Sequence, residues 1–215
     1  MKVEAAVTCV FVDIGDVLLN DGWDHDARKR AAEFFDIEYA SLNDRHHLKV
    51  EPFEEGRITL DEYLDFVVFN EKRVFTQDQF RDFMFAQSEP FPEMIEMVSR
   101  LRSHHGQKIV AVSNEGRELN AYRIQKFGLA SFVDCFISSC FVHIRKPDPD
   151  IFKLALDVAQ VPVSRIAYVE NTPLFVQVAE SLGIRTVLHT SYATTCATLT
   201  TMGVWKGKGV NHDPI

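Results

Sequence analysis

The sequence predicts an α/β fold in which a doubly wound, Rossmann-like core with a parallel sheet is interrupted after its first strand by helices. Residues 7–12 are apolar, mostly β-branched and uncharged, as expected for a buried strand. From Phe91 onward, helical and strand-like patterns alternate, which is typical of a parallel sheet with right-handed crossovers. The 215 residues suffice for one large core and a small insertion.

The alternating region defines the remaining elements of the core. We expect helices over 93–104, 116–127, 148–159 and 172–182, and strands over 108–112, 133–138, 165–169 and 186–189. The first strand must join this sheet, so the core comprises residues 1–19 and 91–215. The tail from Ser191 is rich in Thr and Gly and carries little signal, and its end is expected to fray.

Residues 20–90 form the expected insertion, a charged and aromatic-rich stretch with helical periodicity and no strand signal. Asp24 can cap a helix that runs through Phe35. Thr59 and Glu62 have the spacing of a capping box, and Thr76 is a third candidate cap. The aromatic residues of this segment are expected to pack against one another.

Composition argues against several classes of function. The net charge of −8 disfavours a nucleic-acid partner, and no long apolar stretch indicates a signal peptide or a membrane span. The four cysteines have no metal-like spacing. We interpret them as reduced thiols, which predicts a cytoplasmic protein.

Polar residues cluster where the predicted strands end, which is the edge at which open α/β sheets bind their ligands. They are Asp13 with Gly15 after the first strand, Ser113 and Asn114 after the second, Lys146 in the loop after the third, and Glu170 and Asn171 after the fourth. Carboxylates suit Mg²⁺, whereas Lys and Ser suit phosphate oxygens. An aspartate can also act as a nucleophile and form an aspartyl-phosphate.

These four segments resemble, in order and spacing, the four motifs of the haloacid dehalogenase superfamily, most of whose members are Mg²⁺-dependent phosphatases. The resemblance covers nearly the whole chain, and the insertion is similar to the superfamily's helical cap. The segment from Glu54 to Thr59 and the Asp-x-Gly form of the first motif resemble the glucose-1-phosphate phosphatase-like subgroup.

The resemblance implies a role for each matching residue. Asp13 matches the nucleophile and a metal ligand, and the backbone carbonyl of Gly15 matches a second ligand. Ser113 matches the phosphate-binding hydroxyl, with Asn114 beside it. Lys146 matches the lysine that orients the nucleophile and neutralises the phosphate. The acidic pair that completes the Mg²⁺ site corresponds to Glu170 and Asn171.

Two positions depart from the family pattern. Gly15 stands where most of these phosphatases have a second aspartate, the general acid, whose help is typically worth roughly 10²–10⁴-fold in rate. The neighbouring Asp16 is ionisable, although adjacent residues face different ways. Asn171 leaves one charge where the family has two, so weaker Mg²⁺ binding is expected.

The first functional hypothesis is a Mg²⁺-dependent phosphatase that acts on a small phosphorylated metabolite, with Trp23 either contacting the leaving group or packing at a hinge. The second is a weakly active or inactive binding or regulatory protein. The third is a metal-independent 2-haloacid dehalogenase, although such enzymes have uncharged residues where this chain has Glu170. Either a monomer or a homodimer is compatible with the sequence.

Overall fold

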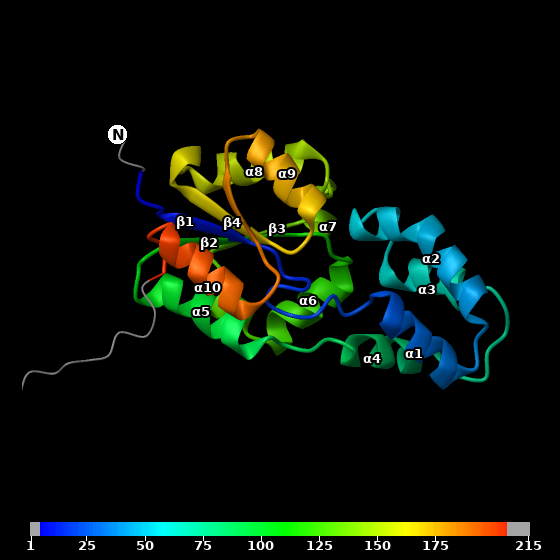
Figure 1. Ribbon diagram of the computed structural model, residues 1–215. Helices are drawn as coiled ribbons and strands as arrows, with labels where there is room; N and C mark the ends of the chain where they lie inside the picture. Colours follow the sequence, from blue (N-terminus) through cyan, green and yellow to red (C-terminus); the bar gives the residue numbers. More distant parts are fainter. Residues whose placement is uncertain (1–4, 206–215) are drawn as a thin grey trace, which may run out of the picture.

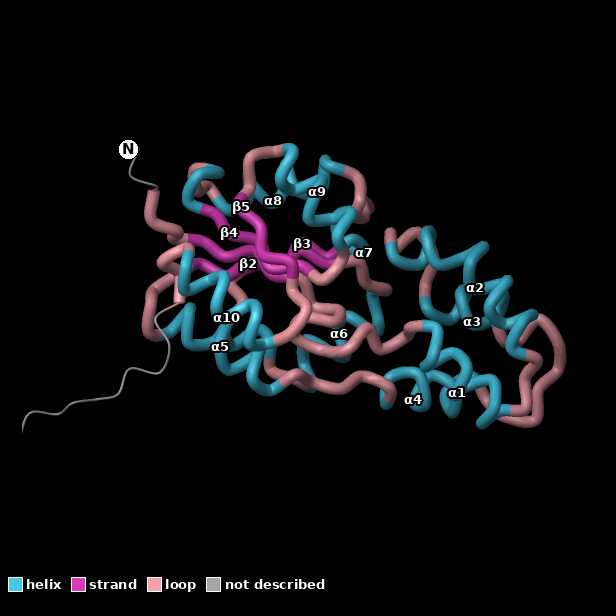
Figure 2. Tube along the Cα trace, in the orientation of Figure 1, coloured by secondary structure: helices cyan, strands magenta, loops and turns pink. Residues whose placement is uncertain are grey.

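The computed structural model describes residues 5–205 (Figures 1 and 2). Its elements are, in chain order, β1 (Cys9–Val12), α1 (His25–Phe35), α2 (Tyr39–Glu54), α3 (Leu60–Val67), α4 (Gln77–Ala86), α5 (Pro92–Ser103), β2 (Lys108–Ser113), α6 (Arg117–Lys126), η1 (Leu129–Ser131), β3 (Cys135–Ser138), α7 (Ser139–Val142), α8 (Pro149–Ala159), η2 (Val163–Arg165), β4 (Ile166–Glu170), α9 (Pro173–Ser181), β5 (Arg185–Leu188) and α10 (Tyr192–Thr201).

The strands form one parallel sheet in the order β3-β2-β1-β4-β5, with β1 at its centre. Val12 at the end of β1 is in register with Ala111 of β2 and Val169 of β4. The backbone N–H of Asp13 continues this pairing and donates to the carbonyl of Val169 at 3.0 Å. The register therefore places the residue after β1 between the carboxyl ends of its two neighbours.

Alternate residues of the strands pack on opposite faces of the sheet, as a pleated strand requires. Val10 and Val12 lie in the core cluster that includes α5 and α10. Cys9 and Phe11 lie in the cluster that includes α8 and α9. Figure 1 shows these two helix layers on either side of the sheet, so the core is doubly wound as predicted.

Helices α1–α4 lie beside the core and have a hydrophobic cluster of their own (Figure 1). The predicted caps are confirmed: Asp24 accepts the N–H of Ala27 at 2.7 Å, and Thr59 and Thr76 each close a capping box. Tyr63 is completely buried among the aromatic side chains of these helices. Most aromatic residues of these helices are buried or half-buried and pack against one another, as expected, whereas Phe34 is 71% exposed and stacks on Phe83.

The chain enters and leaves these helices at one place. Leu19 and Pro90 form an antiparallel bridge. Asn20 hydrogen-bonds Glu89 in both directions, because its N–H donates to the Glu89 carbonyl and its side-chain oxygen accepts the Glu89 N–H, each at 2.9 Å. The two crossings between these helices and the strands of the sheet therefore lie side by side.

Three α-helices, α2, α7 and α10, were not predicted from the sequence. Helix α2 contains Pro52, which interrupts the usual helical pattern. Helix α10 starts at a capping box between Ser191 and Thr194, within the segment that carried little sequence signal. The chain end expected to fray lies outside the described residues. Within residues 5–205, every helix is too short or too polar to cross a membrane.

Candidate active site

The predicted site residues meet at the carboxyl edge of the sheet, around a cavity of about 260 Å³. Its lining includes Asp13, Gly15, Asn114, Lys146 and Asn171. Ser113 and Glu170 are not among the lining residues, and both are buried at the ends of their strands. The structure thus brings five of the seven predicted residues to the cavity and buries the other two at the ends of β2 and β4.

Lys146 is the electrostatic centre of the site. Its ammonium group is almost fully buried and lies 2.7 Å from Oδ2 of Asp13 and 2.8 Å from Oε2 of Glu170. The Phe175 ring stands 4.9 Å from the same ammonium group, in cation–π contact. A buried ammonium between two carboxylates fixes the direction of the Asp13 side chain.

Both carboxylate oxygens of Glu170 are used in this arrangement. Its Oε2 accepts from Lys146 and from the Tyr168 hydroxyl, and its Oε1 accepts the N–H of Thr172 at 2.9 Å. Tyr168 and Glu170 are two residues apart on β4, so their side chains share one face. Sequence reasoning missed Tyr168, although this spacing was the signal that could have indicated it.

Ser113, the last residue of β2, and Asn114, which follows it, make different contacts in the structure. The amide of Asn114 donates to the Lys146 carbonyl at 2.9 Å and accepts the Lys146 N–H at 2.8 Å, so it holds the lysine loop in place. The Ser113 hydroxyl is buried and has no hydrogen-bond partner among the described residues. An unsatisfied buried hydroxyl costs about 1–3 kcal/mol, a penalty that a bound oxyanion would remove.

Burial and charge act against each other in this cluster. Burial raises the pKa of Asp13, and Lys146 opposes this shift. Burial also works to raise the pKa of Glu170, but Lys146 and Tyr168 outweigh it and hold that pKa below the ordinary value. The pKa of Lys146 is raised because the two carboxylates overcome the effect of its burial. One ammonium therefore pairs with two carboxylates, and their shared positive charge opposes the effect of burial on both.

Helix α2 reaches the wall of the cavity through its last residues. Glu54 lines the cavity and pairs with Arg145 at 2.6 Å, and the Ser139 hydroxyl donates to its carbonyl at 2.6 Å. Gly56, at φ 62°, lies so close to Cys140 that a Cβ would come within 2.3 Å of the Cys140 carbonyl oxygen. The inserted helices thus dock directly beside Lys146.

A smaller cavity of about 100 Å³ adjoins the first, with Asp21, Glu54 and Asn114 in both linings. Trp23 lines it but is mainly a packing residue: it is 7% exposed, donates from Nε1 to the Tyr63 hydroxyl at 2.9 Å and packs edge-on against Phe80.

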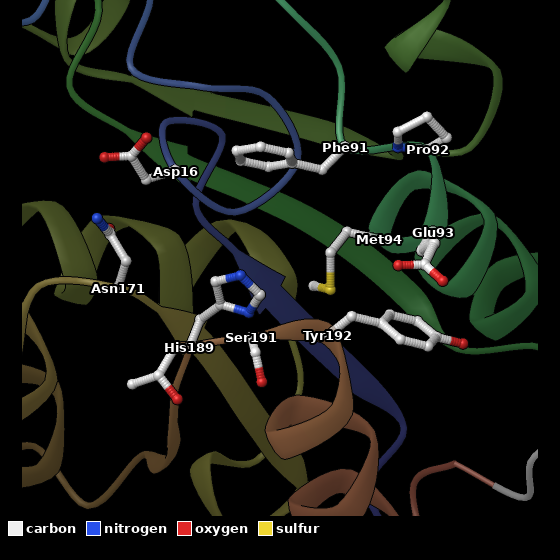
Figure 3. A pocket seen from close by; sticks show the side chains of 10 residues that line it. Asp16, Phe91, Pro92, Glu93, Met94, Asn171, His189, Ser191 and Tyr192 are labelled. Carbon is white, nitrogen blue, oxygen red and sulfur yellow. The ribbon is translucent and has the colours of Figure 1, made fainter.

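A further pocket of about 480 Å³ lies on the other side of the site (Figure 3). It shares Asp16 and Asn171 with the main cavity, and these two residues lie along one side of the view in Figure 3. His189 projects between them and Met94 and Tyr192, which come from the starts of α5 and α10. The cavity is therefore open toward this flank as well as toward the inserted helices.

Comparison with known proteins agrees with this architecture. The sequence model of the haloacid dehalogenase-like hydrolases matches residues 7–190. The chain belongs to this family. As a HAD-like hydrolase it is an enzyme built on the family's parallel α/β core. The glucose-1-phosphate phosphatase-like subgroup is not confirmed, and no curated protein sequence matches this hydrolase.

Solved structures share its fold at low sequence identity. A predicted HAD-like hydrolase from Porphyromonas gingivalis has a TM-score of 0.74 at 20% identity, with 94% of this chain and 100% of that chain covered. A HAD family enzyme from Bacteroides thetaiotaomicron, in complex with magnesium and inorganic phosphate, has a TM-score of 0.71 at 16% identity, over 85% and 94%. L-2-haloacid dehalogenase from Xanthobacter autotrophicus, with chloropropionic acid covalently bound, has a TM-score of 0.61 at 14% identity, over 93% and 85%.

The residues around the cavity fit a hard cation of modest affinity. Among residues 5–205, no three or more His, Cys, Asp or Glu side chains are grouped as a metal cluster. The cavity nevertheless presents the Asp13 carboxylate, the Gly15 backbone and the Asn171 amide, all sources of oxygen ligands. Mg²⁺ usually keeps several waters and needs only one or two carboxylates from the protein. Both Glu170 oxygens already accept hydrogen bonds, from Lys146 and from the Thr172 N–H. This conformation therefore does not favour Glu170 as a direct metal ligand, and that role stays a prediction.

Proposed function

We propose that this HAD-like hydrolase is a Mg²⁺-dependent phosphatase that acts on a small phosphorylated metabolite through an aspartyl-phosphate on Asp13. The observation that supports this most directly is the buried Lys146 ammonium, 2.7 Å from the Asp13 carboxylate beside a small polar cavity. The buried Ser113 hydroxyl at the end of β2 has no hydrogen-bond partner among the described residues and would supply a donor for a phosphate oxygen.

In this mechanism, Asp13 attacks phosphorus in line with the bond to the leaving group. Oδ1 of Asp13 accepts the Ile14 N–H at 2.8 Å and Oδ2 faces Lys146, so the carboxylate cannot rotate freely. Lys146 and Ser113 then stabilise the negative charge on the transferring phosphoryl group. Water cleaves the aspartyl-phosphate, which releases phosphate and restores Asp13.

The proposed Mg²⁺ ligands are Asp13, the carbonyl of Gly15 and Asn171, with Glu170 assigned to positioning Lys146. Bound Mg²⁺ would offset the phosphate charge. The single carboxylate in this set is the reason to expect weak binding, because a divalent cation is held by charged oxygen ligands.

We further propose that residues 20–90 act as a cap over residues 1–19 and 91–215. The paired crossings at residues 20 and 90 would serve as its hinge, and the contacts of Glu54 with Arg145 and Ser139 would close it beside the phosphate. Closure of this kind excludes bulk water from the reaction. A cytoplasmic location and a monomer or homodimer remain predictions.

A second candidate is a metal-independent 2-haloacid dehalogenase. It is favoured by the uncharged Asn171 at the cavity and by the engagement of buried Glu170 with Lys146, which leave Asp13 as nucleophile without the acidic pair that this family has after the fourth strand. A weakly active or inactive binding protein is the third candidate, because Gly15 and Asn171 remove two groups that catalysis would use.

One set of assays separates these functions. Phosphate release is measured over sugar phosphates, nucleotides and acyl phosphates with Mg²⁺, with EDTA, and after Mg²⁺ is added back. Halide release from 2-chloropropionate is measured in parallel. We expect phosphate release that EDTA abolishes and Mg²⁺ restores. Halide release that is insensitive to EDTA would instead indicate the dehalogenase, and inactivity in all assays would indicate the binding protein.

A further inference from the structure

Gly15 has no side chain at the position where most phosphatases of this family have their general acid. The carboxylate of Asp21 lies beside this position. A Cβ placed on Gly15 would lie 3.6 Å from Oδ1 of Asp21. Any side chain at position 15 would therefore point toward the Asp21 carboxylate. Asp21 follows the first motif by only a few residues, yet sequence reasoning gave it no role because the fold of the intervening loop was unknown.

The backbone of Asp21 is held firmly at this place. Its N–H donates to Oδ1 of Asp16 at 3.0 Å, and its carbonyl accepts from Nη1 of Arg123 at 3.3 Å. The next residue, Gly22, has φ 77°, a conformation that glycine adopts without strain. These contacts hold the backbone of Asp21 in place, and none of them involves the Asp21 side chain.

The carboxylate itself remains available for chemistry. Among the described residues, no hydrogen bond or ion pair engages the Asp21 carboxylate oxygens. Asp21 lines the main cavity together with Asp13 and Lys146, and it also lines the smaller cavity with Trp23 and His46. It therefore lies between the cavity that contains Asp13 and Lys146 and the smaller cavity beside it.

The charged groups that act on Asp21 come from several elements: Asp16, Asp24, Glu54, Glu115, Arg28 and Arg123. The surrounding protein raises the pKa of Asp21, Asp16 and Asp24 add to this, and the two arginines oppose it. Asp21 is an exposed residue despite these charged neighbours.

We propose that Asp21 is the general acid of the phosphatase reaction, in place of the side chain that Gly15 lacks. This inference rests on the proposed phosphatase function. As Asp13 forms its bond to phosphorus, the bond from phosphorus to the leaving oxygen breaks, and Asp21 gives that oxygen its proton. The Asp21 carboxylate then takes a proton from the water that attacks the aspartyl-phosphate, so phosphate leaves and both aspartates return to their starting states.

The two competing carboxyl groups are less well placed. Glu54 is paired with Arg145 at 2.6 Å. Asp16 accepts the Asp21 N–H through Oδ1, a bond that an asparagine at position 16 would keep. Asp16→Asn is therefore the matched control for Asp21→Asn, because it removes the neighbouring acid and preserves the hydrogen bond to the loop.

The test compares a good leaving group with a poor one. kcat/KM is measured with Mg²⁺ for p-nitrophenyl phosphate and phenyl phosphate in the wild type, Asp21→Asn and Asp16→Asn, and melting temperatures verify folding. We expect Asp21→Asn to lose about 10²-fold or more on phenyl phosphate and at least roughly tenfold less on p-nitrophenyl phosphate, because nitrophenolate leaves without a proton. Asp16→Asn should keep the wild-type ratio of the two substrates.

A rescue variant extends the test. Gly15 has no positive φ, and its Cβ position is at an ordinary contact distance from Asp21, so an aspartate fits there. Gly15→Asp in the Asp21→Asn background should regain most of the loss on phenyl phosphate. Equal losses on both substrates, or the selective loss in Asp16→Asn instead, would overturn the assignment while the phosphatase function stands. Absence of Mg²⁺-dependent phosphate release in the wild type would overturn both.

Discussion

Arg123 of α6 is buried at 1% exposure and ties the core to the loop that precedes α1. Its Nη1 contacts both Glu115 oxygens, at 2.8 and 3.0 Å, and its guanidinium also donates to the carbonyls of Asn20 and Asp21. We expect Arg123→Met to destabilise the protein strongly. Methionine fills much of the volume but leaves the Glu115 carboxylate buried without a counter-charge.

The size of the effect follows from this burial. Removing one partner of a buried ion pair costs about 3–5 kcal/mol, because the remaining charge stays in a medium that solvates it poorly. For a chain of this length, that corresponds to a fall in melting temperature of roughly 6–20 °C. Burial already raises the pKa of Glu115 to about 7, against the influence of Arg123. Loss of Arg123 raises that pKa further, so the penalty should be smaller near pH 6 than near pH 8, where ionisation is favoured.

Urea unfolding of the wild type, Arg123→Met, Glu115→Gln and the double variant measures this directly. We expect the double variant to be more stable than the sum of the single losses by about 1–3 kcal/mol, since a neutral amide at position 115 no longer needs the guanidinium. A loss below about 1 kcal/mol in Arg123→Met, or losses that simply add, would refute the argument from the buried charge.

Three further predictions concern the site and the inserted helices. Lys146→Ala should lower kcat/KM at least roughly 10²-fold, because both carboxylates and the phosphate lose their fixed counter-charge; a normal kcat/KM would exclude this role. Asn171→Asp should lower the Mg²⁺ concentration for half-maximal activity, or enlarge the Mg²⁺-induced shift in melting temperature, by adding a charged ligand; an unchanged Mg²⁺ response would argue against a cation at this position. Burial lowers the pKa of His46 to about 3, and the charges of Arg28 and His47 add to this effect. Between pH 6.5 and pH 3 the unfolded chain therefore binds a proton at His46 that the folded protein does not. The free energy of unfolding should fall by up to roughly 4 kcal/mol over this range. His46→Gln should flatten that part of the pH–stability curve.

The core could be predicted from sequence because its elements differ in hydrophobic period. Apolar runs such as Ile166–Val169 contrast clearly with the amphipathic helices between them, and parallel strands joined by helices are expected to have right-handed crossovers. The capping boxes that begin at Thr59 and Thr76 could also be predicted, because each is formed by residues only three positions apart in the sequence. Helix α2 lacked a clear apolar stripe and contained Pro52, and α10 consisted largely of threonine and alanine, so neither had a distinct pattern.

From the sequence, only those site residues that lie at the ends of strands could be predicted to come together. The convergence of Asp13 with Lys146 follows from a parallel sheet and is confirmed by their contact. The fixed position of Glu170 depends on the Tyr168 hydroxyl and the Thr172 N–H, which periodicity does not reveal. The placement of Asp21 depends on the loop geometry around Gly15, which is a property of the fold and not of spacing.

The central claim is that Asp13 is the nucleophile of a Mg²⁺-dependent phosphatase. Asp13→Asn tests it most directly, because the substitution is nearly isosteric and removes the attacking charge, although its single amide oxygen can replace only one of the two acceptors that serve the Ile14 N–H and Lys146. Phosphate release is measured over the substrate panel with Mg²⁺, with melting temperature as the control for folding. The account predicts phosphate release by the wild type and, in a folded Asp13→Asn variant, less than a few per cent of it. A variant that folds and retains substantial Mg²⁺-dependent phosphate release would contradict the account.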